Sequence, residues 1–315
     1  MSTRRTAPFT TDDGSEFAIE RRAHPWRWVT AIVAILVVIW VASIIFFNER
    51  IHWDAVGQYL FDGRILRGIG VTIWISITAT ALGLILGVVI AVMKLSNNPV
   101  LKWIAEAYIW FFRGTPVLVQ LIFWFNLAFL LPYITIQIPW TLIGYRWDTN
   151  DVISGTTAAV LGLGLNLAAY FAETVRAGIL AVDKGQTEAA LVGGMTRGQA
   201  MRLVVLPQAL RIVIPPTANE FISMLKTTSL IIVVAGNDLM SEASKIYKQN
   251  NMIIELLIVA SLWYMLMTAI ATYLQSRLER RFGKDRVRIA RGNGTQGRLI
   301  DLVTGPIKMP ARNAK

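Results

Sequence analysis

The chain of 315 residues contains no cysteine and only two histidines. Without cysteine it can form neither a disulfide nor a thiolate metal site, and His24 and His52 lie far from any cluster of metal-ligating residues. We therefore expect no metal site. Charged residues are also scarce, at 16% of the chain, whereas apolar residues make up 54%. An ordinary soluble domain is about 25% charged, so this balance is typical of a membrane protein.

Six stretches are apolar enough to form membrane helices, because about 20 apolar residues cross a hydrocarbon core of about 30 Å. The stretches are 28–47, 68–93, 115–136, 152–172, 210–234 and 254–275. No cleavage motif follows the first stretch, which favours a retained anchor over a signal peptide. The expected fold is therefore an all-α polytopic membrane protein with about six transmembrane helices.

The formal net charge of +11 has an uneven distribution along the chain. Lysine and arginine gather before residue 28, after the second stretch, between 176 and 211, and after residue 275, whereas the intervening loops are nearly neutral. Basic loops face the cytoplasm in membrane proteins. This pattern predicts that both termini and the 176–211 segment are cytoplasmic, and it explains the positive charge without nucleic acid.

The segment 185–210 is polar and rich in alanine and glycine, although it lies between two apolar stretches. Asp183 with Gln186, and Thr196 with Gln199, have the spacing of helix capping boxes. These two signals predict a pair of short helices.

Small residues separate and line these two helices. Gly193 and Gly194 should end the first helix, and Pro207 should either break the second or begin the next span. Ala189 and Ala190 add almost no side chain, and Glu188 offers one charge for a partner cation. We interpret the segment as a docking surface.

The fifth apolar stretch breaks the pattern of a simple anchor. Pro215 and Pro216 should interrupt its helix. Glu220 and Lys226 are charges within it, and each costs about 2.5–3.5 kcal/mol at the bilayer centre on insertion scales. They should therefore face a watery cavity or pair with other helices, and both roles stay open. Further polar residues at comparable depths complete a candidate substrate pathway: Asn166, Thr227, Thr228 and Ser229.

Two local pairs have structural interpretations. Glu173 and Arg176 are three residues apart, which predicts an ion pair on one helix. Gly83 and Gly87 form a small-xxx-small pair, which we expect to serve close helix packing within one subunit.

Several separated motifs carry a resemblance to a known family. The segment from Glu188 to Pro207 is similar to the EAA loop of ABC importer permeases. Four further motifs resemble the polar amino-acid uptake branch of that family: FRGTPVLVQL, AAYFAETVRAGI, LPQALR and NEFISMLKTTSL. The resemblance extends from about Leu66 to Phe282.

This resemblance implies that residues 185–195 form a coupling helix that docks on a separate ATPase subunit. The implied coupling residues are Gly185, Gln186, Glu188, Ala189, Ala190, Gly193, Gly194, Leu206 and Pro207. ATP and Mg²⁺ would then bind to the ATPase. GGMTRGQA has Gln199 and Ala200 where a phosphate loop needs Lys and Ser/Thr, so we expect no cofactor and no catalytic residue in this chain.

The resemblance also implies partners. Two ATPase subunits and a second permease, identical or homologous, would complete the importer in the inner (plasma) membrane, in contact with its lipid. An extracytoplasmic amino-acid-binding protein would dock on the loops 132–150 and 236–251 and deliver the amino-acid substrate. Many relatives have Asp where this chain has Thr227, which favours a neutral or acidic amino acid.

The expected organisation has four parts. Residues 1–27 form a cytoplasmic tail, and 28–65 form an extra transmembrane helix with an outer linker. Residues 66–282 form a five-helix permease domain of the type I importer class that contains the coupling segment 183–207. The basic tail 283–315 should be largely disordered.

Other classes of function fit less well. An ion-coupled secondary transporter would also use broken helices and buried charges, but it gives no reason for the alanine- and glycine-rich segment. A DNA-binding helix-turn-helix is disfavoured because the second short helix has only Arg197 and Arg202 for phosphate contacts. An enzyme is disfavoured because the sequence outside the apolar stretches contains no group of residues that could serve together as nucleophile, base and acid.

Overall fold

The computed structural model describes residues 9–10, 16–17, 25–137 and 144–303. The chain divides into two units, Met1–His52 and Trp53–Lys315. In the first unit, strand β1 (Phe9–Thr10) pairs antiparallel with β2 (Glu16–Phe17), and helix α1 (Pro25–Phe46) follows. The first predicted apolar stretch lies in α1, whose large apolar side chains are exposed, as in Trp40 at 64%.

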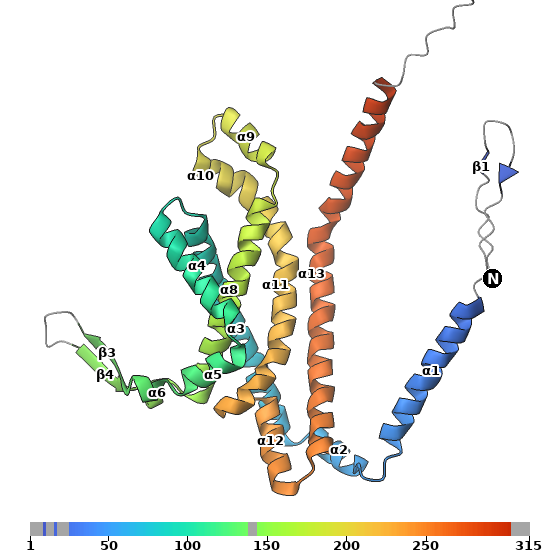
Figure 1. Ribbon diagram of the computed structural model, residues 1–315, viewed down its shortest axis with the longest axis vertical. Coiled ribbons are helices and arrows are strands. Elements are labelled where there is room, and N and C mark those ends of the chain that lie inside the picture. The colour runs from blue at the N-terminus through green and yellow to red at the C-terminus, as the bar shows by residue number, and fades with distance from the viewer. Residues whose placement is uncertain (1–8, 11–15, 18–24, 138–143, 304–315) are drawn as a thin grey trace, which may run out of the picture. The chain divides into compact units, whose positions relative to one another are not determined.

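The second unit is largely helical (Figure 1). Its first half contains α2 (Trp53–Leu60), α3 (Gly63–Leu95), α4 (Pro99–Gly114), α5 (Val117–Phe125), α6 (Leu127–Leu130), β3 (Tyr133–Gln137), β4 (Gly144–Asp148) and α7 (Thr149–Val152). Its second half contains α8 (Gly155–Leu180), α9 (Lys184–Val192), α10 (Arg197–Ala200), the π-helix η1 (Met201–Val205), α11 (Leu206–Thr227), the 3₁₀-helix η2 (Thr228–Val234), α12 (Leu239–Asn250) and α13 (Ile253–Val303).

The helices α3 and α8 form the main packed pair of this unit. A Cβ atom at Gly83 would lie 2.8 Å from Leu167, and one at Gly87 would lie 2.8 Å from Phe171. Only glycine permits this approach, so the predicted use of the two glycines for packing within one subunit is confirmed.

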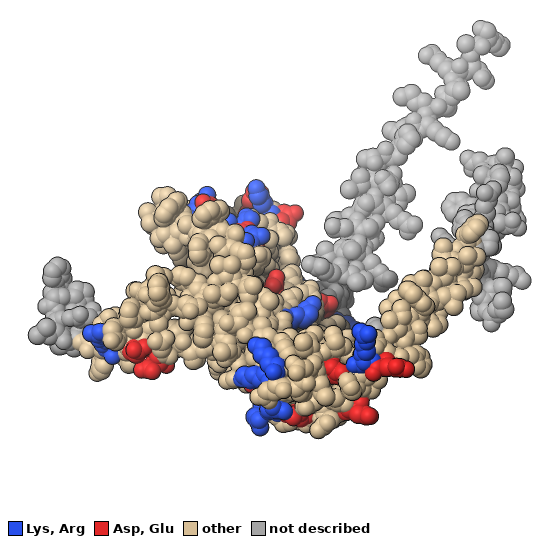
Figure 2. Space-filling view, turned by 60° about the horizontal axis from the view of Figure 1, so that its bottom comes forward, with Lys and Arg blue, Asp and Glu red and all other residues tan. Residues whose placement is uncertain are grey.

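Other helices pack against the two ends of α3. At its start, α2, α12 and α13 enclose an apolar cluster that includes Ile65 and Leu239, and the Thr72 hydroxyl accepts a hydrogen bond from the Leu239 N–H at 3.1 Å. At its end, Ile90 and Ala91 pack with residues of α4 and α8. Charged residues gather mainly at the ends of the helices, so the visible sides of the body are largely uncharged (Figure 2).

Three helical segments are long and apolar enough to cross a membrane: α3, α8 and the Ile253–Arg277 part of α13. Two bent pairs raise the number to five among the described residues if each pair is one span. The apolar part of α1, Trp28–Ile44, is shorter. A mostly helical protein with several spans is therefore confirmed.

The prediction of a single third span over 115–136 is wrong. Within this stretch α5 already ends at Phe125, and only the four-residue α6 follows it. At its start α4 and α5 meet at an angle of 101°, because Pro116 has no N–H to continue the helix. The chain beyond α6 then enters strand β3.

The predicted interruption at Pro215 and Pro216 is also wrong, because both lie inside α11. The two prolines have no N–H to donate to the carbonyls of Arg211 and Ile212, four residues earlier, which membrane helices tolerate when neighbouring groups compensate. The Thr217 hydroxyl donates to the adjacent Val213 carbonyl at 2.7 Å. The helix changes instead at η2, and Ala235 then adopts a left-handed conformation with φ 54°.

Two further expectations differ from the structure. The predicted loop 236–251 contains helix α12, which is capped by the carboxylate of Asp238. The basic tail is helical as far as Val303, because α13 continues through a segment without proline; residues 304–315 lie outside the described part.

Candidate functional site

The segment 183–207, called the corner below, lies at one end of the second unit, and α12 lies at the opposite end (Figure 1). Its first helix, α9, begins where the Asp183 carboxylate accepts a hydrogen bond from the Gly185 N–H at 2.6 Å. This cap replaces the predicted capping box with Gln186. The helix ends before Gly193, and Gly194 takes the left-handed backbone with φ 86°, which glycine adopts at least cost.

The second helix of the corner starts with the predicted capping box. The Gln199 backbone N–H donates to the Thr196 hydroxyl at 3.3 Å, and the side-chain Oε1 of Gln199 accepts from the Thr196 backbone N–H at 2.8 Å. From α10 the chain continues through η1 directly into α11, with Pro207 in its first turn. The corner therefore joins α8 to α11 by two short helices.

The surface of the corner is smooth and accessible. Of the predicted coupling residues only Ala190 is buried; Gly185, Gln186, Glu188, Ala189, Gly193, Gly194, Leu206 and Pro207 are exposed. Val192 is 90% exposed, and no atom lies within 4 Å of a Cβ built on Gly194. A groove between α8, α9, α10 and η1 presents Lys184, Glu188 and Arg197. Another protein surface can approach this backbone closely.

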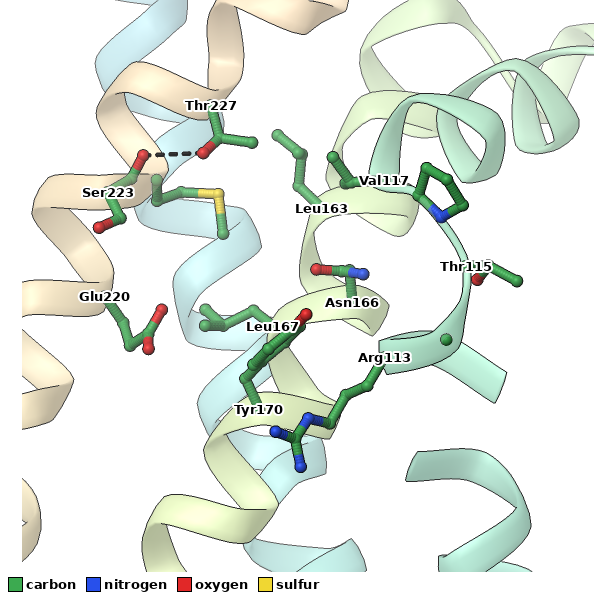
Figure 3. A pocket seen from close by; sticks show the side chains of 13 residues that line it. Arg113, Thr115, Val117, Leu163, Asn166, Leu167, Tyr170, Glu220, Ser223 and Thr227 are labelled. Atoms are coloured by element: carbon green, nitrogen blue, oxygen red, sulfur yellow. Dashed lines mark hydrogen bonds between the residues drawn. The ribbon is translucent and has the colours of Figure 1, made fainter. Parts of the chain in front are cut away.

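A second site is a cavity of about 570 Å³ at the bend between α4 and α5. Its walls come from the bend, from α8 and from α11 (Figure 3). Three of the predicted pathway residues line it together: Asn166, Glu220 and Thr227. We call this cavity the bend pocket.

The other predicted pathway residues do not line the bend pocket. Lys226 is exposed on α11, and the Thr228 side chain is buried, with its hydroxyl donating to the Leu225 carbonyl at 2.7 Å. The Ser229 hydroxyl donates to the Lys226 carbonyl at 2.7 Å. Both hydroxyls thus satisfy carbonyls at the end of α11.

Sequence reasoning missed part of the bend pocket. Arg113, Tyr170 and Ser223 also line it, and the Arg113 guanidinium lies 5.0 Å from the centre of the Tyr170 ring. In Figure 3 Glu220 and Arg113 come from different walls, with Leu167 and Tyr170 drawn between them and Asn166 above Arg113 in the view. The Gly-Thr-Pro sequence after Arg113 is the signal that could have located the helix break and hence this pocket.

Two side-chain amides stabilise the break. The bend interrupts the ladder of backbone hydrogen bonds, and the Phe112 carbonyl accepts from Asn166 at 2.9 Å and from Gln120 at 3.0 Å. Gln120 also donates to the Thr115 hydroxyl at 2.7 Å. Asn166 therefore joins α8 to the bend, and its side-chain oxygen also faces the pocket (Figure 3).

An ionic network lies on α8 between the bend pocket and the corner. Glu173 accepts hydrogen bonds from Lys94 of α3 at 2.5 Å and from Arg176 at 3.0 Å. The predicted Glu173–Arg176 pair is confirmed, and Lys94 was missed because it is distant in the sequence. Within the described ranges, no three His, Cys, Asp or Glu residues are grouped so that they could hold a metal ion.

Comparison with known families identifies the chain. A family model described as the binding-protein-dependent transport system inner membrane component matches residues 79–284, more than half of the chain. The chain belongs to this family. It is therefore a multi-pass inner-membrane permease component of a transport system, as expected from the sequence, and its family is a class of transport subunits rather than of enzymes.

Individual permeases support the same assignment. The arginine transport system permease protein ArgU of Corynebacterium glutamicum is 42% identical, over 84% of this chain and 83% of that protein. The probable glutamine ABC transporter permease protein GlnM of Bacillus subtilis is 35% identical, over 75% of this chain and 100% of that protein. The similarity to these two permeases gives no support to the alternative of an ion-coupled secondary transporter.

Solved structures agree with the permease fold. A crystal structure of an amino acid ABC transporter with histidines matches with 35% sequence identity and a TM-score of 0.62, over 71% of this chain and 97% of that chain. An inward-facing MetNI methionine ABC transporter matches with a TM-score of 0.56 over 70% of this chain and 96% of that chain, but at 17% identity it supports the fold alone.

Proposed function

We propose that this permease carries a polar amino acid into the cytoplasm as one subunit of an ATP-driven importer, with the corner docked on a separate ATPase subunit. The observation that carries this proposal is the position of the corner in the chain. It joins α8 to α11, and these same two helices form walls of the bend pocket. A partner that displaces the corner would therefore move both walls.

The bend pocket offers both charges that a zwitterionic amino acid requires. The Arg113 guanidinium is a donor for a carboxylate, and the Glu220 carboxylate is an acceptor for an ammonium group. Asn166 and Thr227 add uncharged polar groups. These contacts suit the backbone common to all amino acids, which agrees with relatives named for arginine, glutamine, and glutamate with aspartate. The choice of a neutral or acidic side chain stays a prediction based on Thr227.

The complete importer would contain two copies of the ATPase, which bind ATP and Mg²⁺, and a second permease. The charge pattern favours a cytoplasmic position for the corner and both termini, with six spans in all: a five-helix core within 66–282 and one extra helix within 28–65. The end of the bundle that carries α12 would then face outward. An extracytoplasmic binding protein would dock on that end.

Uptake by the reconstituted importer tests the pathway. Glu220→Gln should reduce ATP-driven amino-acid uptake about tenfold or more, because a hydrogen bond to a charged group contributes about 1.5–3 kcal/mol. Lys226→Gln is the matched control, since Lys226 is close in sequence but outside the pocket lining, and it should retain uptake. Prior screening of the binding protein against the twenty amino acids identifies the substrate to use.

Two results would contradict the proposal. If the Glu220→Gln variant takes up the amino acid at the wild-type rate, the bend pocket does not lie on the substrate pathway. Uptake that follows an ion gradient and continues without ATP would replace the ATPase-coupled mechanism with the ion-coupled one.

A further inference from the structure

The hairpin formed by β3 and β4 is amphipathic. In its antiparallel register Ile134 lies opposite Trp147, and residues directly opposite each other share one face of a sheet. Tyr145 is two residues from Trp147 and so lies on the same face. Thr135 and its partner Arg146 lie on the other face. One face thus carries only apolar and aromatic side chains, whereas the other carries this polar pair together with the pair of Tyr133 and Asp148.

The aromatic face is accessible. Tyr145 is 72% exposed and Trp147 is 42% exposed, and their rings stack with centroids 5.7 Å apart. On the opposite face the Arg146 guanidinium lies 3.5 Å from the centre of the Tyr133 ring. An isolated two-stranded hairpin has little stability in water, so an exposed aromatic face of this kind requires a partner surface.

The hairpin is attached at both ends to helices that span the membrane. It follows the α4–α5 bent pair through α6, and α7 connects it to α8. At its base the Thr149 N–H donates to the Pro132 carbonyl at 3.0 Å, and the Thr149 hydroxyl donates to the Leu131 carbonyl. Figure 1 shows α6 and the hairpin extending sideways from the bundle near the end of α5. These attachments hold the hairpin close to the membrane surface.

Exposed apolar side chains also occur along the chain between α4 and the hairpin. On α5, Ile122 and Phe123 are 45% and 48% exposed, and on α6 Phe129 and Leu130 are 90% and 60% exposed. The elements that carry these side chains precede the hairpin in the chain and follow the α4 half of the bent pair. Tryptophan and tyrosine are enriched where membranes meet water, because their rings combine an apolar body with a polar group.

We propose that the β3–β4 hairpin lies on the membrane surface, with Ile134, Tyr145 and Trp147 inserted among lipid headgroups and acyl chains and with Arg146 facing water. The hairpin then fixes the depth of the α5 end and the α8 start in the bilayer. This role assigns the apolar face of the segment 132–150 to lipid instead of to the binding protein expected there from the sequence, and it leaves the α12 end of the bundle for that protein. It does not depend on the transported substrate or on the ATPase.

The absence of cysteine makes a direct test possible. Tyr145→Cys and Arg146→Cys each introduce a single site for a nitroxide label in the full chain, reconstituted in phosphatidylcholine–phosphatidylglycerol vesicles. The label at 145 should collide mainly with oxygen, which concentrates in lipid, and the label at 146 mainly with a water-soluble nickel chelate. The ratio of oxygen to nickel accessibility should be several-fold higher at 145 than at 146.

A label at Trp147→Cys repeats the measurement with the Tyr145 ring intact and should match position 145. Equal access of nickel to 145 and 146 would overturn the proposal, because both faces would then be in water. A label at 145 or 147 that is shielded from both reagents would also overturn it, because a protein surface, such as a second copy of this chain, would then cover the face.

Discussion

The α3–α8 pair and the corner are both rich in small residues, but they use them in opposite ways. In α3 a Cβ on Gly87 would lie 2.8 Å from Phe171 and 3.0 Å from the Ala168 carbonyl. In the corner nothing lies within 4 Å of a Cβ on Gly194 or Gly198. Small residues thus bring two helices of one chain together in the first region, whereas in the second they leave space for another molecule. The surroundings decide which role a small residue has.

The largest expected effect comes from adding volume to the α3–α8 contact. Gly87→Val should destabilise the folded permease by about 3 kcal/mol, the upper end of the usual cost of overpacking, because the Ala168 backbone cannot move aside easily. Thermal unfolding of the detergent-purified protein measures this change. Gly70→Val is the matched control on the same helix, since nothing lies within 4 Å of its Cβ. Equal melting temperatures for the two variants would contradict the close packing of α3 and α8.

The reverse result is expected in the corner. Ala189→Trp should leave the melting temperature of the isolated permease nearly unchanged, because Ala189 is exposed. It should nevertheless abolish most ATP-driven uptake and weaken co-purification with the ATPase, because the indole ring prevents close approach of the partner. Ala189→Ser keeps the surface small and should behave as wild type. Normal uptake by Ala189→Trp would show that the corner is not the docking surface.

A smaller effect is expected at the ionic network, which links α3 to α8 between the two regions. Glu173→Gln should lower stability by about 1–2 kcal/mol, since it weakens two charge-assisted hydrogen bonds in a partly buried position. Glu242→Gln is the control, because Glu242 forms a single ion pair at 2.6 Å and its partner Lys245 is 48% exposed, and it should cost less than about 0.5 kcal/mol. A larger loss for the control would reverse this ranking of the two pairs.

Most of the helices could be predicted from the sequence, because a long apolar run has few alternatives to a helix in a membrane. The runs 68–93, 152–172 and 254–275 correspond to α3, α8 and the apolar part of α13. The capping box formed by Thr196 and Gln199 was also predictable, since its hydrogen bonds join residues that are only three positions apart.

The breaks in the helices were predicted less well. Pro215 and Pro216 lie within α11 because the surrounding structure accommodates them, whereas Pro116 coincides with a bend of 101°. Proline has the same covalent structure at all three sites. The difference comes from partners such as Gln120 and Asn166, which satisfy the carbonyl freed at the bend.

The sequence by itself determined the membrane location, the family and the corner with its exposed small residues, because these depend on composition and on motifs of adjacent residues. Only the tertiary structure decided that Arg113 and Tyr170 share the bend pocket with Glu220, that Lys226 lies outside its lining, and that Lys94 pairs with Glu173. Such contacts join residues that are distant in the chain. They depend on how α3, α4, α8 and α11 pack, and local sequence does not specify that packing.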